Sequence, residues 1–389
     1  MIKSVWISCS NRSEYGLIRP LLKEMTERAE YEYVLRGTLI LYSDALNNCS
    51  EDAFRDFKKS SIEIVQWRET KIKKDESLNE HFGRLVYGFS RNDFFKCDLL
   101  MVAGDRYESF ALEQSAFYQR IPIAHLFGGD ISNGGHFDDH VRHAMSHLAS
   151  VHFPVNKTAY DNLIAMKQEE SRVFLVGSPV VDDMVCITQT SGGESICDVL
   201  ISFNPMTLQA SNAVARDLRL TLEALELIQS QMKLRCLATC PNHEPGVQEL
   251  LDVYNEFEGK EWFQLVESLG SPKYLYAIKE SKIVVGNSSS QVLEVPLLGQ
   301  RCLLIGDRQK GRHRPASVVH VPCVADAFFI KNTILGMLKS EAPAPCEDYG
   351  VPGVSRKIVE VVGQLNNLPR NILVQKNNPL PNLDEANIA

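Results

Sequence analysis

Residues 98–118 read DLLMVAGDRYESFALEQSAFY, and this stretch decides the fold. It opens with a short apolar run, Asp98–Ala103, which ends in the turn Gly104-Asp105-Arg106. The pattern of Tyr107–Tyr118 favours a helix, and a second apolar run follows at Ile121–Leu126. A strand, a helix and a second strand in this order predict a parallel βαβ unit.

The same alternation extends in both directions from this unit, with one interruption. In the N-terminal half we expect strands at Lys3–Cys9, Tyr33–Leu41, Glu63–Trp67, Asp98–Ala103, Ile121–Leu126, Val151–Val155 and Val173–Val176, and helices at Leu17–Arg28, Leu78–Phe94, Tyr107–Tyr118 and Asp138–Leu148. After the turn-rich segment Thr188–Glu194 we expect strands at Asp198–Phe203, Leu234–Thr239, Phe263–Ser268, Lys282–Val285 and Arg301–Ile305, and helices at Asn212–Lys233, Gly246–Glu256, Tyr274–Glu280 and Ser290–Leu298.

The predicted fold class is therefore α/β, with two Rossmann-like, doubly wound domains that face a central cleft. A length of 389 residues also favours two domains. We expect an N-terminal domain at 1–186, a C-terminal domain at 197–368 and a polar C-terminal tail at 369–389, on the surface or partly disordered. In such folds ligands bind at the carboxyl ends of the strands.

Composition limits the possible partners. The formal net charge is −8, which argues against nucleic acid or an anionic membrane as the main partner. We see neither a secretory signal nor a run of about 18 apolar residues, so we expect a cytoplasmic protein. The cysteines in apolar runs are interpreted as small core residues in a reducing compartment: Cys9, Cys49, Cys97, Cys302 and Cys323.

A candidate anion site follows the strand Lys282–Val285. The next residues, Gly286-Asn287-Ser288-Ser289-Ser290, combine a glycine turn with hydroxyl groups at the start of an expected helix. Free backbone N–H groups and the helix dipole converge at such a position and favour a phosphate. The alternative is that these polar side chains only cap the helix.

Cations after two other strands favour the phosphate interpretation. Arg308, Lys310, Arg312 and Arg314 follow the strand Arg301–Ile305 in an otherwise acidic protein. Arg12 follows the first strand and would face the same cleft. Guanidinium groups at strand ends are suited to a pyrophosphate, whereas the alternative is a solvated basic loop.

Carboxylates and imidazoles gather at the strand ends of the N-terminal half, and these groups transfer protons near neutral pH. They are Asp105, Arg106, His125, Asp130, His136, Asp138, Asp139, His140 and His143. His136, His140, His143 and His147 share one helix face, which raises the alternative of a metal site. Because no H-E-x-x-H motif is present and carboxylates suffice for sugar chemistry, we expect no metal.

Taken together, these segments resemble the hydrolysing UDP-N-acetylglucosamine 2-epimerases of sialic-acid synthesis and their relatives in legionaminic-type pathways. The matching stretches keep the family's order: Ser10-Asn11-Arg12-Ser13-Glu14-Tyr15-Gly16, Gly104-Asp105-Arg106, Gly128-Gly129-Asp130, Asp138-Asp139-His140-Val141-Arg142-His143, Val176-Gly177-Ser178-Pro179, Phe203-Asn204-Pro205, Gly286-Asn287-Ser288-Ser289 and Gly306-Asp307-Arg308-Gln309.

This resemblance implies the two-domain GT-B fold and a UDP-linked 2-acetamido sugar as substrate. The implied reaction removes the C2 proton, expels UDP to leave a glycal, and adds water to give the free 2-epimer, N-acetylmannosamine in the commonest case. It further implies no cofactor and a homodimer or homotetramer.

The resemblance also assigns candidate roles to residues. The catalytic candidates are Asp105, Asp138, Asp139 and His143, to which we add Asp130. The nucleotide and phosphate candidates are Arg12, Ser288, Ser289, Ser290, Glu294, Arg308, Gln309 and Arg312. The sugar-binding candidates are Arg106, His125, Phe127, Arg142 and Asn204.

Three positions depart from the family pattern. Phe127 stands where the sialic-acid enzymes carry a glutamate thought to be catalytic, so Asp130, His125 or His136 would have to replace its function. Asn204 replaces a histidine, and Gln291 replaces a small residue. We interpret Phe127 as a sign of a less polar sugar, for example a 2,4-diacetamido-2,4,6-trideoxyhexose.

Other functions remain as alternatives at this point. A GT-B glycosyltransferase would share the fold and the nucleotide site but would transfer the sugar to an acceptor. A non-hydrolysing 2-epimerase would return the nucleotide sugar intact. A non-catalytic binding protein would not need the cluster of aspartates and histidines.

Overall fold

The computed structural model describes residues 4–10, 12–27, 36–42, 53, 55–58, 60, 62–67, 73, 75–91, 97–132, 138–189, 195–206, 212–241, 246–322, 326–365 and 368–381. Contacts divide the chain into two compact units. Unit 1 comprises the described residues of Met1–Asp130, Asp138–Asp182 and Gly350–Ala389, and unit 2 comprises those of Ile131–Phe137 and Asp183–Tyr349.

Unit 1 is a doubly wound α/β unit. Its described strands are β1 (Ser4–Cys9), β2 (Arg36–Tyr42), β3 (Glu63–Trp67), β4 (Leu99–Ala103), β5 (Ile123–Leu126) and β6 (Val151–Phe153), and they form one sheet in the order β3-β2-β1-β4-β5-β6. Every described pairing is parallel. Its helices are α1 (Arg12–Glu27), α3 (Leu78–Phe89), α4 (Tyr107–Tyr118), α5 (Asp138–Leu148), α6 (Lys157–Ala165), α13 (Val354–Leu365) and α14 (Arg370–Val374), with a 3₁₀ turn η2 (Glu170–Arg172).

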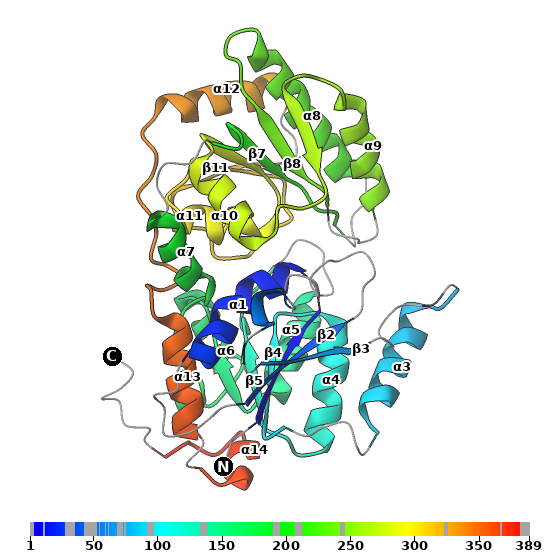
Figure 1. Cartoon of the computed structure of the whole chain (residues 1–389), viewed down its shortest axis with the longest axis vertical. Helices are drawn as coiled ribbons and strands as arrows, with labels where there is room; N and C mark the ends of the chain where they lie inside the picture. The colour runs from blue at the N-terminus through cyan, green and yellow to red at the C-terminus, as the bar shows by residue number, and fades with distance from the viewer. Residues whose placement is uncertain are drawn as a thin grey trace. The chain divides into compact units, whose positions relative to one another are not determined.

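Alternation along the strands explains why both faces of this sheet are covered. Successive side chains of a strand point to opposite faces. Trp6 and Leu100 belong to the apolar core that packs against α3, α4 and α5. Their neighbours Val5 and Met101 lie with Leu21 of α1 and residues of α13 on the other side. The helices therefore form two layers around the sheet (Figure 1).

The C-terminal segment returns to unit 1, which the strand–helix pattern did not predict. Helix α13 packs against α1. The guanidinium of Arg172 is buried and donates to five backbone carbonyls, those of Ser150, Ile372, Leu373, Gln375 and Asn378, at 2.7–3.1 Å. Leu373 and Leu380 are buried as well. The described part of segment 369–389, which we expected to be a surface tail, therefore packs against the rest of unit 1. The chain thus changes unit near Asp182 and again near Gly350, rather than at 186 and 368.

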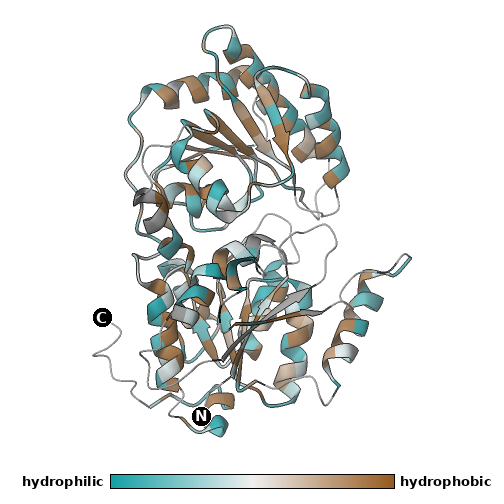
Figure 2. Cartoon of the chain, in the orientation of Figure 1, coloured by the Kyte–Doolittle hydropathy of each residue, from teal (hydrophilic) through white to brown (hydrophobic). Residues whose placement is uncertain are grey.

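Unit 2 repeats the architecture. Its strands are β7 (Val199–Ser202), β8 (Cys236–Thr239), β9 (Phe263–Val266), β10 (Ile283–Gly286), β11 (Cys302–Ile305) and β12 (Val318–Val321), in the order β12-β11-β10-β7-β8-β9 and again parallel. Its helical segments are α8 (Asn212–Gln229), α9 (Val247–Phe257), α10 (Ser271–Glu280), η3 (Ser289–Gln291), α11 (Glu294–Leu297) and α12 (Ala327–Lys339); α7 (Val180–Gln189) carries the chain in from unit 1. Helix α8 packs against α9 and α12. The strands of this sheet are largely hydrophobic (Figure 2).

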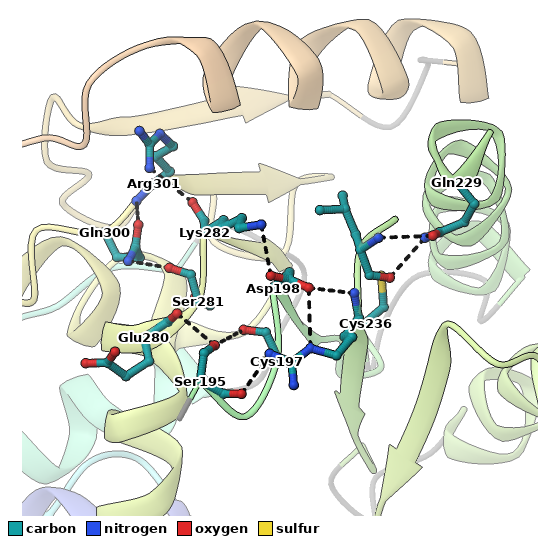
Figure 3. A network of polar contacts seen from close by, with 12 residues as sticks. Ser195, Cys197, Asp198, Gln229, Cys236, Glu280, Ser281, Lys282, Gln300 and Arg301 are labelled. Atoms are coloured by element: carbon teal, nitrogen blue, oxygen red, sulfur yellow. Dashed lines mark hydrogen bonds and ion pairs between the residues drawn. The ribbon is translucent and has the colours of Figure 1, made fainter. Parts of the chain in front are cut away.

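A polar network connects the loops at the amino-terminal edge of the unit 2 sheet (Figure 3). Asp198, just before β7, accepts from the backbone N–H of Arg235 at 2.8 Å and pairs with Lys282 at 3.0 Å. The hydroxyl of Ser195 donates to the carbonyls of Cys197 and Glu280. These bonds join the loops before β7, β8 and β10 and leave the opposite edge of the sheet for the candidate site.

The structure confirms the predicted class of two Rossmann-like units and corrects several elements. Val173–Val176 is not a strand, since only Val173 makes an isolated bridge, to His152. The helix expected at Ser290–Leu298 is instead a 3₁₀ turn followed by the four-residue α11. Pro296 lies inside that segment and has no N–H to donate, which disfavours a continuous helix. Strand β12 and helices α6, α7, α12, α13 and α14 were not predicted.

Within the described residues, no helix has both the length and the apolar character required to cross a membrane.

We predict that Arg172→Met destabilises the protein by on the order of 3 kcal/mol, because unpaired buried acceptors cost about 1–3 kcal/mol each. Urea unfolding measures the change. The matched control is Arg370→Met, since the exposed Arg370 makes one bond, to the Arg120 carbonyl. That variant should lose less than about 1 kcal/mol. Equal losses in the two variants would contradict the anchoring function of Arg172.

Candidate active site

The functional side chains of unit 1 gather at the carboxyl edge of its sheet. Strands β1, β4 and β5 are adjacent and parallel, so the turns that follow Cys9, Ala103 and Leu126 lie at the same edge. Glu14 lies near the turn after β1. Asp105 and Arg106 lie in the turn after β4, and Phe127 to Asp130 lie in the turn after β5.

Arg142 of α5 joins these segments. Its side chain is 2% exposed and forms ion pairs with Asp105 and, at 2.6 Å, with Asp139. The same guanidinium donates to the backbone carbonyl of Asp130 at 2.9 Å. Burial acts to lower the pKa of Arg142. The nearby carboxylates of Asp105, Asp130 and Asp139 outweigh this effect and raise the pKa of Arg142 above its ordinary value. The guanidinium of Arg142, which we predicted to bind the sugar, thus pairs with the carboxylates of Asp105 and Asp139.

His125 is held on both ring nitrogens by the protein. Its Nδ1 lies 3.0 Å from Ser146 Oγ and its Nε2 lies 2.9 Å from the Gly104 carbonyl oxygen. Burial lowers the pKa of His125 to about 4, so the ring is neutral at pH 7. This arrangement argues against the expectation that His125 binds the sugar or replaces a catalytic carboxylate.

The remaining candidates of unit 1 lie around this centre. Asp138 begins α5. On the same helix, burial lowers the pKa of His143, and the nearby Arg142 cation lowers it further. Arg106 precedes α4 and pairs with Glu108 at 3.1 Å. His136 lies outside the described residues. Arg12 begins α1, but its side chain also lies outside them.

Phe127 adopts a left-handed backbone conformation, with φ of 65°, in the turn after β5. Its N–H donates to the Phe153 carbonyl at 3.2 Å, which fixes the turn. Asp130, three residues later, keeps a carboxylate in the same turn. Gly128 must lack a side chain here, because an added Cβ would lie 2.8 Å from His125 Nδ1 and 2.9 Å from Ser146 Oγ.

The strand-end loops of unit 2 are bound to one another by buried amides. Asn287, after β10, accepts from the Asn204 N–H at 2.7 Å and donates to the Asn204 carbonyl at 2.9 Å. Gln309 donates to the Asn287 carbonyl at 2.9 Å, and Arg308 Nε donates to the Pro205 carbonyl at 2.9 Å. The loops after β7, β10 and β11 therefore form one connected wall.

Several buried polar atoms lie together at this wall: Tyr274 OH, Ser290 Oγ, Glu294 Oε2 and Gln309 Oε1. The Ser290 hydroxyl lies beside both Tyr274 and Glu294 and lowers the pKa of each, whereas Gln309 Oε1 has no hydrogen-bond partner among the described residues. Burial raises the pKa of Glu294, and Arg312 opposes that rise. Burial also raises the pKa of Tyr274 to about 12, with Glu294 adding to it. A buried polar atom without a partner, such as Gln309 Oε1, is expected where a polar ligand supplies that partner.

The serine loop differs from its prediction in one respect. Ser288 caps the 3₁₀ turn, and its Oγ lies 3.4 Å from the Ser290 N–H. Because α11 is only four residues long, little helix dipole points at Ser288 or Ser289. Any anion here is held by backbone N–H groups, hydroxyls and the arginines. Tyr274 of α10 was not predicted as a site residue, because no spacing or motif in that helix distinguishes it from a core residue.

Among the residues that the structure describes, no group of three His, Cys, Asp or Glu side chains is arranged to hold a metal ion. His140, His143 and His147 lie on α5 as the spacing predicted. Burial lowers the pKa of His147, whose Nδ1 lies 3.1 Å from Gln168 Nε2.

Comparison with known sequences places these features in a family. Residues 45–363 match the family model described as UDP-N-acetylglucosamine 2-epimerase. The chain is similar to the GDP/UDP-N,N'-diacetylbacillosamine 2-epimerase (hydrolyzing) of Campylobacter jejuni, with 27% identity over 82% of this chain and 84% of the relative. It is 25% identical to the UDP-N,N'-diacetylbacillosamine 2-epimerase (hydrolyzing) of Legionella pneumophila, over 84% and 87% of the two chains. It is 28% identical to the polysialic acid biosynthesis protein P7 of Escherichia coli, over 84% of each chain.

Solved structures share the fold. The UDP-GlcNAc 2-epimerase of Neisseria meningitidis bound to UDP-GlcNAc superposes with a TM-score of 0.73 at 18% identity, over 93% of this chain and 100% of that one. The Methanocaldococcus jannaschii UDP-GlcNAc 2-epimerase, in complex with UDP-GlcNAc and UDP, gives 0.74 at 16% identity, over 92% and 99%.

We predict that Gly128→Ala destabilises the protein by about 1–3 kcal/mol, because its Cβ would overlap the His125–Ser146 pair. Urea unfolding measures the loss. Gly83→Ala is the matched control, since Gly83 lies inside α3 with nothing within 4 Å of an added Cβ. Alanine there should stabilise the helix by about 1 kcal/mol. A Gly128→Ala variant as stable as the wild type would contradict this prediction, because it would show that His125 and Ser146 can shift to accommodate the added Cβ.

Proposed function

The chain belongs to the UDP-N-acetylglucosamine 2-epimerase family, and on this premise we propose that it is a hydrolysing 2-epimerase of a UDP-linked 2-acetamido sugar. The relatives from Campylobacter jejuni and Legionella pneumophila are described as hydrolysing enzymes, and the chain aligns with more than four fifths of the length of each. The observation that carries the proposal is the group of Asp105 and Asp139 around the buried Arg142.

The proposed reaction begins at C2 of the sugar. A carboxylate, for which we propose Asp105, takes the C2 proton, and the released electron pair forms a double bond between C1 and C2. The bond from C1 to the diphosphate oxygen breaks, and UDP leaves with that pair of electrons. A second acid then gives a proton to C2 on the opposite face, with the electron pair of the double bond, while the oxygen of a water molecule bonds to C1 and that water gives up a proton to a carboxylate. Two acid–base groups are therefore required, and Asp130, Asp138, Asp139 and His143 are the candidates for the second.

Arg142 supports this chemistry from outside the substrate. It is buried and paired, so the carboxylates of Asp105 and Asp139 keep fixed positions before the substrate arrives. Preorganised charges of this kind need no rearrangement during the reaction. We propose that Arg142 positions the acid–base groups and that Arg106 contacts the sugar.

For the nucleotide we propose the connected wall of unit 2. Ser288, Ser289 and Ser290 with Arg308, Gln309 and Arg312 would contact the diphosphate, and Glu294 would accept hydrogen bonds from the ribose. The cluster of buried polar groups on Glu294, Ser290 and Tyr274 supports this assignment, and so does Gln309 Oε1, which a hydroxyl-rich ligand would satisfy. Asn204 would contact the sugar beside them.

For the sugar itself we propose a 2,4-diacetamido-2,4,6-trideoxyhexose rather than N-acetylglucosamine, in a pathway of the legionaminic type. Phe127 offers an apolar ring in the turn after β5, where a sugar that lacks a 6-hydroxyl would be tolerated. The names of the Campylobacter jejuni and Legionella pneumophila relatives, both diacetylbacillosamine 2-epimerases, support this substrate.

We also propose a cytoplasmic homodimer or homotetramer. The described cysteines carry free thiols, as expected in a reducing compartment. Tyr87 of α3 and Tyr118 of α4 are 73% and 84% exposed, and large aromatic rings on a surface are enriched at interfaces.

We predict that the protein, incubated in deuterated water with UDP-N-acetylglucosamine or its UDP-2,4-diacetamido-2,4,6-trideoxy analogue, releases UDP and a free 2-epimer deuterated at C2. Proton NMR follows both reactions, and the diacetamido substrate should react faster. Epimerised nucleotide sugar without UDP release would instead identify a non-hydrolysing enzyme. Binding of UDP without any reaction would favour a glycosyltransferase and contradict the proposal.

We predict that Asp105→Asn lowers kcat by on the order of 10²–10⁴-fold, because it removes the proposed acid–base group. Calorimetric binding of UDP should change little, since the nucleotide wall lies in unit 2. Asp161→Asn is the control, because Asp161 is an exposed residue of α6 that pairs only with Lys157 among the described contacts. Loss of UDP binding together with activity would count against this assignment of Asp105.

A further inference from the structure

A buried carboxyl group lies directly beside the turn that carries Asp105. Glu14 is in the first turn of α1 and is 7% exposed. Its Oε2 accepts a hydrogen bond from the Ser10 N–H at 2.6 Å, just after β1. Its Oε1 lies beside Gly104, since a Cβ built on that glycine would be 3.4 Å away. The carboxyl group of Glu14 thus connects the turn after β1 with the turn after β4.

The two turns are already held close by other contacts. Strands β1 and β4 are hydrogen-bonded neighbours, with Val5 opposite Leu99. The Ser10 hydroxyl lies 2.9 Å from the hydroxyl of Ser109, in α4, which follows the second turn. A change in the charge of Glu14 would therefore act at a rigid junction and could not be absorbed by a free loop.

The surroundings of Glu14 favour its neutral form. Burial raises its pKa to about 8, while the Ser10 hydrogen bond and the Arg106 cation oppose this rise and the carboxylates of Asp105 and Glu108 add to it. His125, whose Nε2 lies 2.9 Å from the Gly104 carbonyl oxygen, has a pKa lowered to about 4 by burial. Two groups whose neutral forms are favoured thus contact Gly104, while Asp105 pairs with Arg142.

We propose that the carboxyl group of Glu14, which connects the turns after β1 and β4, is a positioning residue for Asp105. It acts as a neutral acid, and loss of its proton in alkaline solution inactivates the site. Ionisation would place a second negative charge beside Asp105 within the rigid junction. That charge would compete for the surrounding cations and displace the acid–base group from its position. The proposal rests on the proposed function, because it takes Asp105 as the residue that transfers the proton.

The test compares the pH dependence of the wild type with that of Glu14→Gln. Glutamine keeps the shape of the side chain and an oxygen that can accept the Ser10 hydrogen bond, but it cannot ionise. The wild type should lose kcat as pH rises through about 8. Glu14→Gln should keep most of its kcat at pH 7 and should lack this alkaline loss. Glu14→Ala should lower kcat at every pH by on the order of 10²-fold through misplacement of Asp105.

Controls separate positioning from a general structural function. Glu24→Gln, on the same helix, should leave the pH profile unchanged. An alkaline loss that persists unchanged in Glu14→Gln would overturn the proposal, and so would full activity of Glu14→Ala.

A second measurement does not depend on turnover. In protein with ¹³C-labelled carboxyl groups, one glutamate resonance that is absent from Glu14→Gln should titrate near pH 8, with a coupled shift in an aspartate resonance that is absent from Asp105→Asn. Titration of Glu14 near pH 4.5 would overturn the proposal. If the wild type released no UDP from any sugar nucleotide, the proposed function would fail, while this titration would still decide the state of Glu14.

Discussion

The buried guanidinium of Arg142 is the constraint on which the candidate active site depends. A cation removed from water must be paired, because an unpaired one destabilises the fold severely. Its partners come from three separate segments: the turn after β4, the turn after β5 and the first turn of α5. Satisfying one buried charge therefore brings Asp105, which lies 37 residues before Arg142 in the chain, together with Asp139.

The same requirement organises the rest of the molecule. Arg172 gathers five carbonyls and so attaches the C-terminal segment to unit 1. In unit 2, the side-chain amide of Asn287 pairs with the backbone of Asn204 and connects the loops after β7 and β10. In each case a buried polar side chain, rather than the apolar core, fixes the course of an irregular segment, because backbone groups outside helices and strands need other partners.

The two units differ in how they treat charge at their strand ends. Unit 1 concentrates carboxylates around one buried cation, and burial favours the neutral forms of the nearby His125 and Glu14. Unit 2 presents a cluster of buried hydroxyl, amide and carboxyl atoms beside a loop of arginines. The first arrangement suits proton transfer, and the second suits the binding of a polar, anionic ligand.

The sequence alone determined the local periodicity and, through it, the fold class. Apolar runs such as Asp98–Ala103 and amphipathic runs such as Tyr107–Tyr118 are local patterns, so they predicted the parallel α/β units and put Asp105 at a strand end. Only the tertiary structure decided that Arg142 pairs with Asp105 and Asp139 and that burial favours the neutral forms of His125 and Glu14. It also decided that Tyr274 joins the unit 2 wall and that the chain returns to unit 1 at Gly350. The physical reason is that burial and the protonation of a side chain depend on neighbours that are distant in sequence, and no short-range pattern specifies them.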